Sequence, residues 1–123
     1  MPKIVVAGAM MQCSHKGMVK LTGGDSRLGV SGAEAITFGM EAKVSFAPGA
    51  PGVVVPCPGP PGSMPPNICT VTLPATAGVS KLVTIAGVGV LLDNATGNAT
   101  NPSDPTATWS IANAGQTLLS ADQ

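Results

Sequence analysis

The stretch Gln12-Cys13-Ser14-His15-Lys16 carries the only histidine of the chain and the first of its three cysteines. If this stretch is extended, the side chains of Cys13 and His15 leave the same face, because strand side chains alternate between faces. Their Cα atoms would then lie about 6.6 Å apart, at a rise of about 3.3 Å per residue. Two side chains at that separation can share one metal ion.

The other two cysteines, Cys57 and Cys69, enclose a segment rich in proline and glycine, residues 58–68. Three thiolates and one imidazole are a complete tetrahedral ligand set of the kind that holds structural zinc. We therefore predict a metal centre with one Zn²⁺ per chain. Its predicted ligands are Cys13, His15, Cys57 and Cys69.

Other interpretations of these residues stay open at this point, because the spacing contains no C-x-x-C pair. Cys57 and Cys69 could form a disulfide and leave Cys13 free, or the three cysteines could be unrelated small apolar residues. A third interpretation is a catalytic pair of Cys13 and His15. Against it stands the lack of a nearby carboxylate that would orient the imidazole.

The composition favours one small domain with a covered surface. A chain of 123 residues suits a single domain, and we expect residues 1–123 to form one without an extension domain. Charged residues are 10% of the chain, against about a quarter in ordinary domains, so we expect a partner to cover part of the surface. Six acidic residues balance six basic ones, and no basic patch for nucleic acid stands out.

No export signal is visible at the N-terminus, where a short apolar run leads directly into Cys13. The apolar run of residues 82–92 is about half as long as a membrane span. We expect the protein to be made in the cytoplasm without a signal peptide and not to insert stably into a membrane. Reduced cytosolic thiols also favour a metal centre over a disulfide.

Short β-prone segments alternate with turns of glycine and proline, which predicts an all-β fold without a long helix. Four of the segments contain a central glycine, at Gly8, Gly32, Gly87 and Gly115, which indicates an internal repeat of hairpin-like units. An exposed loop is expected at residues 93–108. The predicted strands are 3–11 (broken at Gly8), 18–21, 27–36, 43–46, 53–55, 69–73 (ending before Pro74) and 81–92. Residues 109–119 are predicted to form a last strand pair.

Several motifs resemble the PAAR-like spike-tip proteins of contractile injection systems. Residues 6–17, with Gly8-Ala9 and Cys13-Ser14-His15-Lys16-Gly17, are similar to that group's opening element GA-x-x-x-C-S-H-x-G. The segments 55–58 and 67–71 are similar to its paired C-P and P-C elements, and 28–33, 83–92 and 114–117 to its other units. The chain departs from the pattern at Ile68, where proline is expected, and in using mostly cysteines where the group favours histidines.

The resemblance covers nearly the whole chain and implies a structural protein, not an enzyme. It implies a small conical, pseudo-symmetric arrangement of short strands with a metal, usually zinc, near the apex. The matching ligand positions are Cys13, His15, Cys57 and Cys69. Such a tip caps and sharpens the trimeric spike of a type VI secretion system or an extracellular phage-tail-like particle. One tip would sit on each trimer, with effector cargo as a further partner, and would be ejected into the target envelope. The alternative is a free-standing zinc-stabilised β domain that binds another protein.

Overall fold

The computed structural model describes residues 2–30, 32–42, 44–46, 49, 50, 52–55, 57, 69–101 and 106–116. This part of the chain contains strands and no helix, which confirms the predicted all-β class. It accordingly holds no helix long and apolar enough to cross a membrane. The strands are β1 (Met10–Cys13), β2 (Met18–Lys20), β3 (Asp25–Val30), β4 (Ala33–Ala35), β5 (Val53–Val55), β6 (Val71–Ile85), β7 (Val88–Thr100) and β8 (Thr108–Asn113).

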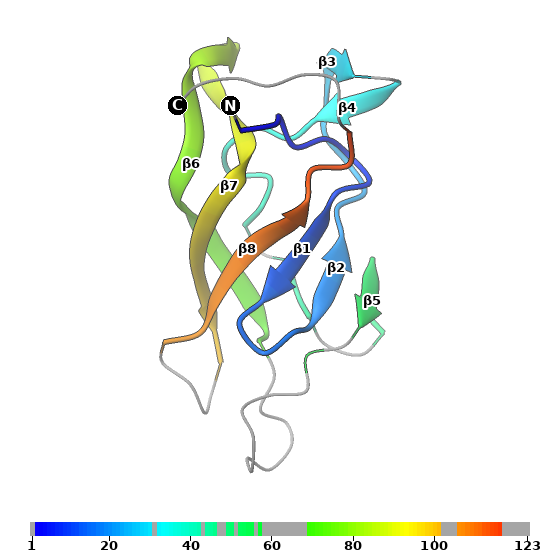
Figure 1. Cartoon of the computed structure of the whole chain (residues 1–123), viewed down its shortest axis with the longest axis vertical. Coiled ribbons are helices and arrows are strands. Elements are labelled where there is room, and N and C mark those ends of the chain that lie inside the picture. The colour runs from blue at the N-terminus through cyan, green and yellow to red at the C-terminus, as the bar shows by residue number, and fades with distance from the viewer. Residues whose placement is uncertain are drawn as a thin grey trace.

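Six of the strands form one antiparallel sheet with the order β5-β2-β1-β8-β7-β6 (Figure 1). β1 lies in its middle, so N-terminal and C-terminal segments are hydrogen-bonded neighbours there. β3 and β4 pair separately as a two-stranded sheet at the upper end of Figure 1. The hairpin turn that follows β1 and the start of β6 both lie toward the opposite, lower end.

The β6–β7 hairpin differs from the prediction. The segment 81–92 was expected to be one strand and 93–108 an exposed loop, but β7 continues to Thr100. Ala86 and Gly87 form the turn, with φ angles of 53° and 84°. Positive φ at both central residues is the signature of a two-residue turn that matches the twist of antiparallel strands. The uninterrupted apolar run therefore belongs to two strands that meet at this turn.

Pro74 does not end the strand at residue 73, as was predicted, because β6 runs through it to Ile85. β6 is an outer strand of the sheet, and its register with β7 shifts between Thr72 and Ala75. An outer strand with an irregular register tolerates a proline, since no ladder hydrogen bond is lost at that residue. The expectation that proline ends a strand fails here because β6 is an outer strand of the sheet.

Two other predicted strands are corrected. The first strand was expected at residues 3–11 with a break at Gly8. The break is present as a turn, but β1 begins only at Met10, and Ile4 and Val6 make isolated bridges before it. Residues 44–46 of the predicted strand 43–46 form no strand. The four glycines of the predicted repeat all have positive φ, between 83° and 97°. Two of them, Gly32 and Gly87, close hairpins, and the repeat itself stays a prediction.

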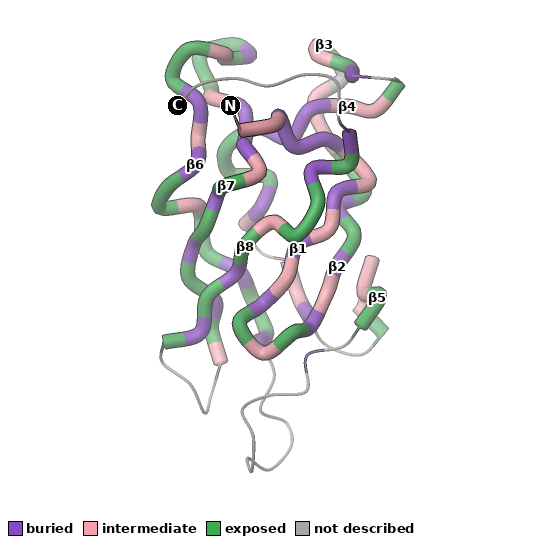
Figure 2. The backbone as a smooth tube through the Cα atoms, in the orientation of Figure 1, coloured by how far each residue is buried: buried purple, intermediate pink, exposed green. Residues whose placement is uncertain are grey.

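The buried side chains form two apolar clusters. Figure 2 shows where buried residues lie along the backbone. The larger contains all three cysteines together with Trp109, Phe46 and Met11. Trp109 is fixed within it because its indole N–H donates to the carbonyl oxygen of Leu73 at 2.9 Å. The smaller cluster is built around Ile4, Val6, Val30, Ala35, Ile85, Val90 and Leu92. The cysteines therefore belong to the core of the molecule.

One buried carboxylate connects a loop to the outer strand. Glu41 is fully buried, and its Oε2 accepts the backbone N–H of Gly39 at 2.8 Å. Its Oε1 accepts the N–H of Ala75 in β6 at 2.9 Å. The hydroxyl of Thr72 donates to the backbone oxygen of Glu41 at 2.6 Å. We call this arrangement the Glu41 clasp; it holds the segment that follows β4 against β6.

Candidate metal centre

Cys13 and His15 are brought together by a turn, not by an extended strand. Cys13 is the last residue of β1, and the following residues form the turn that leads into β2. The N–H of Cys13 donates to the oxygen of Gly17 at 3.0 Å, and the N–H of Lys16 donates to the oxygen of Cys13 at 3.0 Å. The extended geometry considered for this stretch is therefore wrong. The turn nevertheless places both side chains at one site.

The turn is fastened to β8 as well. The N–H of Ser14 donates to the carbonyl oxygen of Thr108 at 2.8 Å. In return, the N–H of Thr108 donates to the hydroxyl oxygen of Ser14 at 3.2 Å. Both bonds are made by Ser14, so they fix the backbone directly before His15 against β8.

Cys57 and Cys69 are positioned through a shared neighbour, Phe46. The N–H of Phe46 donates to the carbonyl oxygen of Cys69 at 3.2 Å. The N–H of Cys57 donates to the carbonyl oxygen of Phe46 at 3.1 Å. Phe46 is fully buried, so its backbone, which bonds to both cysteines, is anchored in the core by its side chain. The segment of residues 58–68 between them lies outside the described residues.

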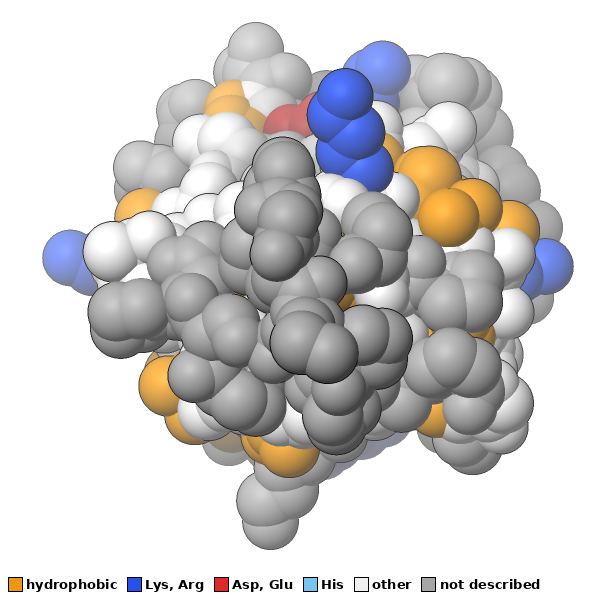
Figure 3. Space-filling model, turned by 90° about the horizontal axis from the view of Figure 1, so that it is seen from below, with side chains coloured by type: hydrophobic (Ala, Val, Ile, Leu, Met, Phe, Trp, Pro, Cys, Tyr) orange, Lys and Arg blue, Asp and Glu red, His pale blue; other side chains and the backbone are white. Residues whose placement is uncertain are grey.

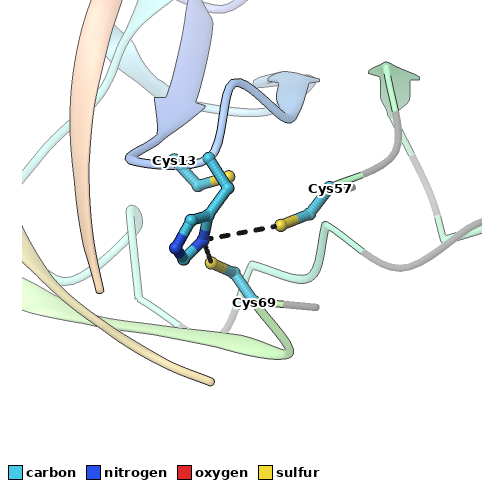
Figure 4. Close-up of side chains that lie close together, drawn as sticks. Cys13, Cys57 and Cys69 are labelled. Carbon is cyan, nitrogen blue, oxygen red and sulfur yellow. Dashed lines mark hydrogen bonds between the residues drawn. The ribbon is translucent and has the colours of Figure 1, made fainter. Parts of the chain in front are cut away.

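The four predicted ligands lie together (Figure 4). The candidate ligand atoms of Cys13, His15, Cys57 and Cys69 are all within 4.8 Å of one another. His15 Nδ1 lies 3.5 Å from the sulfur of Cys69 and 3.9 Å from that of Cys57. In a tetrahedral zinc site, metal–ligand bonds near 2.3 Å to sulfur and 2.0 Å to nitrogen place such atoms about 3.6 Å apart. The two distances from His15 Nδ1 are close to that value.

The site is closed to solvent on its sulfur side. Cys13 and Cys57 are each 3% exposed and Cys69 is fully buried, whereas His15 is half-buried. All three cysteines are free thiols, so the structure contains none of the disulfides considered above. Four protein donors with no fifth partner are what a structural metal ion needs, since a catalytic ion keeps one position open. The four residues could therefore hold a metal ion.

Two N–H groups point at the sulfurs. The backbone N–H of Gly17 donates to Cys13 Sγ at 3.2 Å, and the side-chain amide of Asn101 donates to Cys69 Sγ at 3.7 Å. Gly17 also has to be glycine, because a Cβ there would lie 2.8 Å from the Cα of Cys57. Such donors stabilise the thiolate form in which cysteine binds metals.

The thiol pKa values of the metal-free site diverge. The thiol of Cys69 donates to Cys13, and this bond lowers the pKa of Cys13 to about 5, assisted by the backbone N–H groups of His15 and Gly17. The same bond raises the pKa of Cys69, as does its burial, while the amide of Asn101 acts in the opposite direction. Without metal, Cys13 and Cys69 therefore titrate as a pair, and the hydrogen bond between the two sulfurs favours the state in which one of them is ionised.

The sequence predicted the four residues that lie together and could hold a metal ion, but not the residues that position them. Gly17 belongs to the C-S-H-x-G element, so the sequence marked it as part of the motif. Nothing in the sequence indicated its close contact with Cys57. Asn101 precedes a proline, and that dipeptide is typical of a turn. Phe46 was expected only as part of a half-buried strand. None of these three carries a residue-type signal for metal binding.

Comparison of the chain with protein-family models, with curated proteins and with solved structures finds no match. The resemblance to spike-tip proteins is therefore not tested by these comparisons and stays a prediction. An all-β protein with a four-residue Cys/His set that could bind a metal ion is the description that the structure supports.

Proposed function

We propose that the protein is a zinc-stabilised tip that caps and sharpens the trimeric spike of a contractile injection system. One observation carries the proposal. A closed set of three thiols and one imidazole joins three distant parts of the chain at one end of an all-β molecule. The motifs that resemble spike-tip proteins include these same four residues.

Zinc suits the donor set best. Soft thiolate ligands select zinc, copper(I) or iron over magnesium or calcium, and a tetrahedral set of sulfur and nitrogen is typical of zinc. Structural zinc contributes on the order of 10 kcal/mol of folding free energy in small domains. A tip driven into an envelope needs resistance to unfolding at its narrow end. The metal would supply that resistance where residues 13, 57 and 69 meet.

The two ends of the molecule suit different contacts. At the turn between β6 and β7, far from the metal centre in Figure 1, Leu82 is 72% exposed and Val88 is 40% exposed. Exposed apolar side chains favour a covered, docked surface. Figure 3 views the molecule from the metal end, where both hydrophobic and Lys or Arg side chains lie on the described part of the surface. We assign docking on the spike to the end that carries Leu82 and Val88, because the metal centre lies toward the opposite end; exposed apolar side chains also occur on β5 and at the start of β6, at Val54, Val55, Val71 and Leu73.

Elemental analysis tests the metal. Protein purified without added metal should carry about one zinc per chain, because the donor set supplies four ligands. The variants Cys57→Ser and Cys69→Ser should lose it. Metal-free protein that contains a Cys57–Cys69 disulfide by mass spectrometry would contradict the proposal.

Binding to a trimeric spike separates the tip from the free-standing domain. Size-exclusion chromatography with the spike trimer encoded nearby should give a complex of one chain per trimer. A chain that stays separate from every such trimer would favour the free-standing zinc domain. Slow thiol alkylation, reversed by a chelator, would argue against a cysteine enzyme, because zinc-bound thiolates in a closed site react slowly.

A further inference from the structure

The side-chain amide of Asn101 lies beside the metal centre, although Asn101 is not one of the four candidate ligands. Its Nδ2 lies 3.7 Å from Cys69 Sγ and donates to it. The N–H of Gly17 makes the equivalent contact to Cys13 Sγ at 3.2 Å. Two of the three sulfurs in the set thus receive an N–H donor, one from a backbone group and one from a side chain.

The position of Asn101 is built by the sheet. The preceding residue, Thr100, pairs with Val71 and accepts the N–H of Thr70, the residue after Cys69, at 2.9 Å. The hydroxyls of Thr70 and Thr100 also lie 3.0 Å apart and share a hydrogen bond. The N–H of Val71 donates to the Thr100 hydroxyl at 3.1 Å. Cys69 and Asn101 therefore lie directly next to a pair of residues held by several hydrogen bonds.

The net charge of the metal-loaded centre explains why an N–H donor such as the Asn101 amide would stabilise it. Three thiolates and a neutral imidazole around a divalent ion leave the centre with a formal charge of −1. Burial makes such a charge costly unless it is hydrogen-bonded. Neutral N–H groups directed at the sulfurs offset it without competing for the metal. Groups that contact metal ligands in this way commonly change metal affinity by about 10- to 100-fold when they are replaced.

We propose that Asn101 is a positioning residue of the metal centre, whose amide orients the Cys69 sulfur and offsets its negative charge. The inference rests on the metal centre proposed above. With the backbone donor of Gly17, Asn101 sets how tightly the ion is held and how readily the sulfurs give up electron density. Cys13 is served by a backbone group that mutation cannot remove, whereas Cys69 depends on one side chain.

The test compares Asn101→Asp with Asn98→Asp. Both variants replace an amide with a carboxylate of the same size, but Asn98 is an exposed residue of β7 three positions away. Asn101→Ala removes the donor without adding charge and serves if the aspartate variant does not fold. Each full-length protein is loaded with Zn²⁺ or with Co²⁺. Metal release to a chromophoric chelator and the sulfur-to-cobalt charge-transfer band are recorded.

We expect release from both Asn101 variants to be about 10- to 100-fold faster than from the parent or Asn98→Asp. The cobalt band should move to longer wavelength, because a sulfur without its donor is oxidised more easily. A purely structural role would change stability without moving the band. Equal release rates and an unmoved band in all four proteins would overturn the role of Asn101 and leave the metal centre intact. A parent that binds neither metal would overturn both.

Discussion

The candidate metal centre and the Glu41 clasp can both connect distant segments of the chain, but they use different chemistry. Each ties a connecting segment to the main sheet: one through four side chains that converge on a single point, the other through a carboxylate that accepts two backbone N–H groups. The clasp is complete within the polypeptide, whereas the four-residue set needs an added ion to become a cross-link. The difference teaches that a chelator would release one tie and leave the other in place.

The largest effect should come from taking the ion away. His15→Ala or a chelator at neutral pH should lower the melting temperature by many degrees in one cooperative step. The reason is that the ion closes loops of more than forty residues between residue 13 and residues 57 and 69. Calorimetry with elemental analysis measures both effects. Lys20→Ala, an exposed change in β2, is the control and should cost less than about 0.5 kcal/mol. If His15→Ala melts and binds zinc like the parent, the ligand assignment is wrong.

Glu41→Ala should have the next largest effect, about 3 kcal/mol of unfolding free energy. It removes two hydrogen bonds to a charged acceptor, each worth about 1.5–3 kcal/mol, from a fully buried position. Denaturant unfolding of the metal-loaded protein measures it. Zinc content should stay at the parental level, since the clasp and the centre are separate ties. Loss of zinc in Glu41→Ala would mean that the two regions are coupled.

Gly17→Ala should cost about 2 kcal/mol, because a crowded methyl group in a packed region typically costs 1–3 kcal/mol. The new Cβ would meet the backbone of Cys57 at 2.8–2.9 Å. Gly23→Ala is the matched control, since a Cβ at Gly23 has no described atom within 4 Å. Thermal melts with and without metal should show that the penalty is greater in the loaded protein. An equal cost in both glycine variants would contradict the close packing of Gly17 on Cys57.

The smallest effect concerns an exposed ion pair in β3. The hydrogen bond from the Arg27 side chain lowers the pKa of Asp25 to about 2 from its ordinary value of 3.8. A lowered carboxyl pKa stabilises the fold above about pH 4, and this contribution is lost as the pH falls through 2. The melting temperatures of Asp25→Asn and the parent should therefore differ slightly at pH 6 and converge below pH 2. A gap that persists in acid would point to a packing role for Asp25.

The contrast between centre and clasp also explains what could be predicted from the sequence. The four residues that could hold a metal ion were predicted because cysteine and histidine are rare here, and because three thiols and one imidazole form a complete ligand set. Glu41 gave no such signal: its partners are backbone groups, and the one in β6 is 34 residues away. The contact of Asn101 with Cys69 was equally hidden, because only the pairing of β6 with β7 brings these two residues together.

Strand class was predictable for a similar reason, and strand limits were not. The Gly and Pro turns and β-prone segments indicate an all-β chain whatever its topology. The course of β6 through Pro74 and of β7 through residues 93–100 depends on which strand lies beside which. That information is held in contacts between distant residues, so no local pattern contains it.

The irregular hydrogen bonding of β6, an edge strand of the sheet, affects how readily copies of this protein can aggregate. Its register with β7 shifts at four places, a proline interrupts its hydrogen-bonding groups, and the N–H of Ala75 is already taken by Glu41. At the other margin of the sheet, β5 has only three residues. Along these two margins of the described six-stranded sheet, a second chain finds no long, regular row of backbone groups to extend, which is how natural sheets avoid growing into aggregates. A protein with so few charges can thus stay dispersed through the shape of its margins instead of through mutual repulsion.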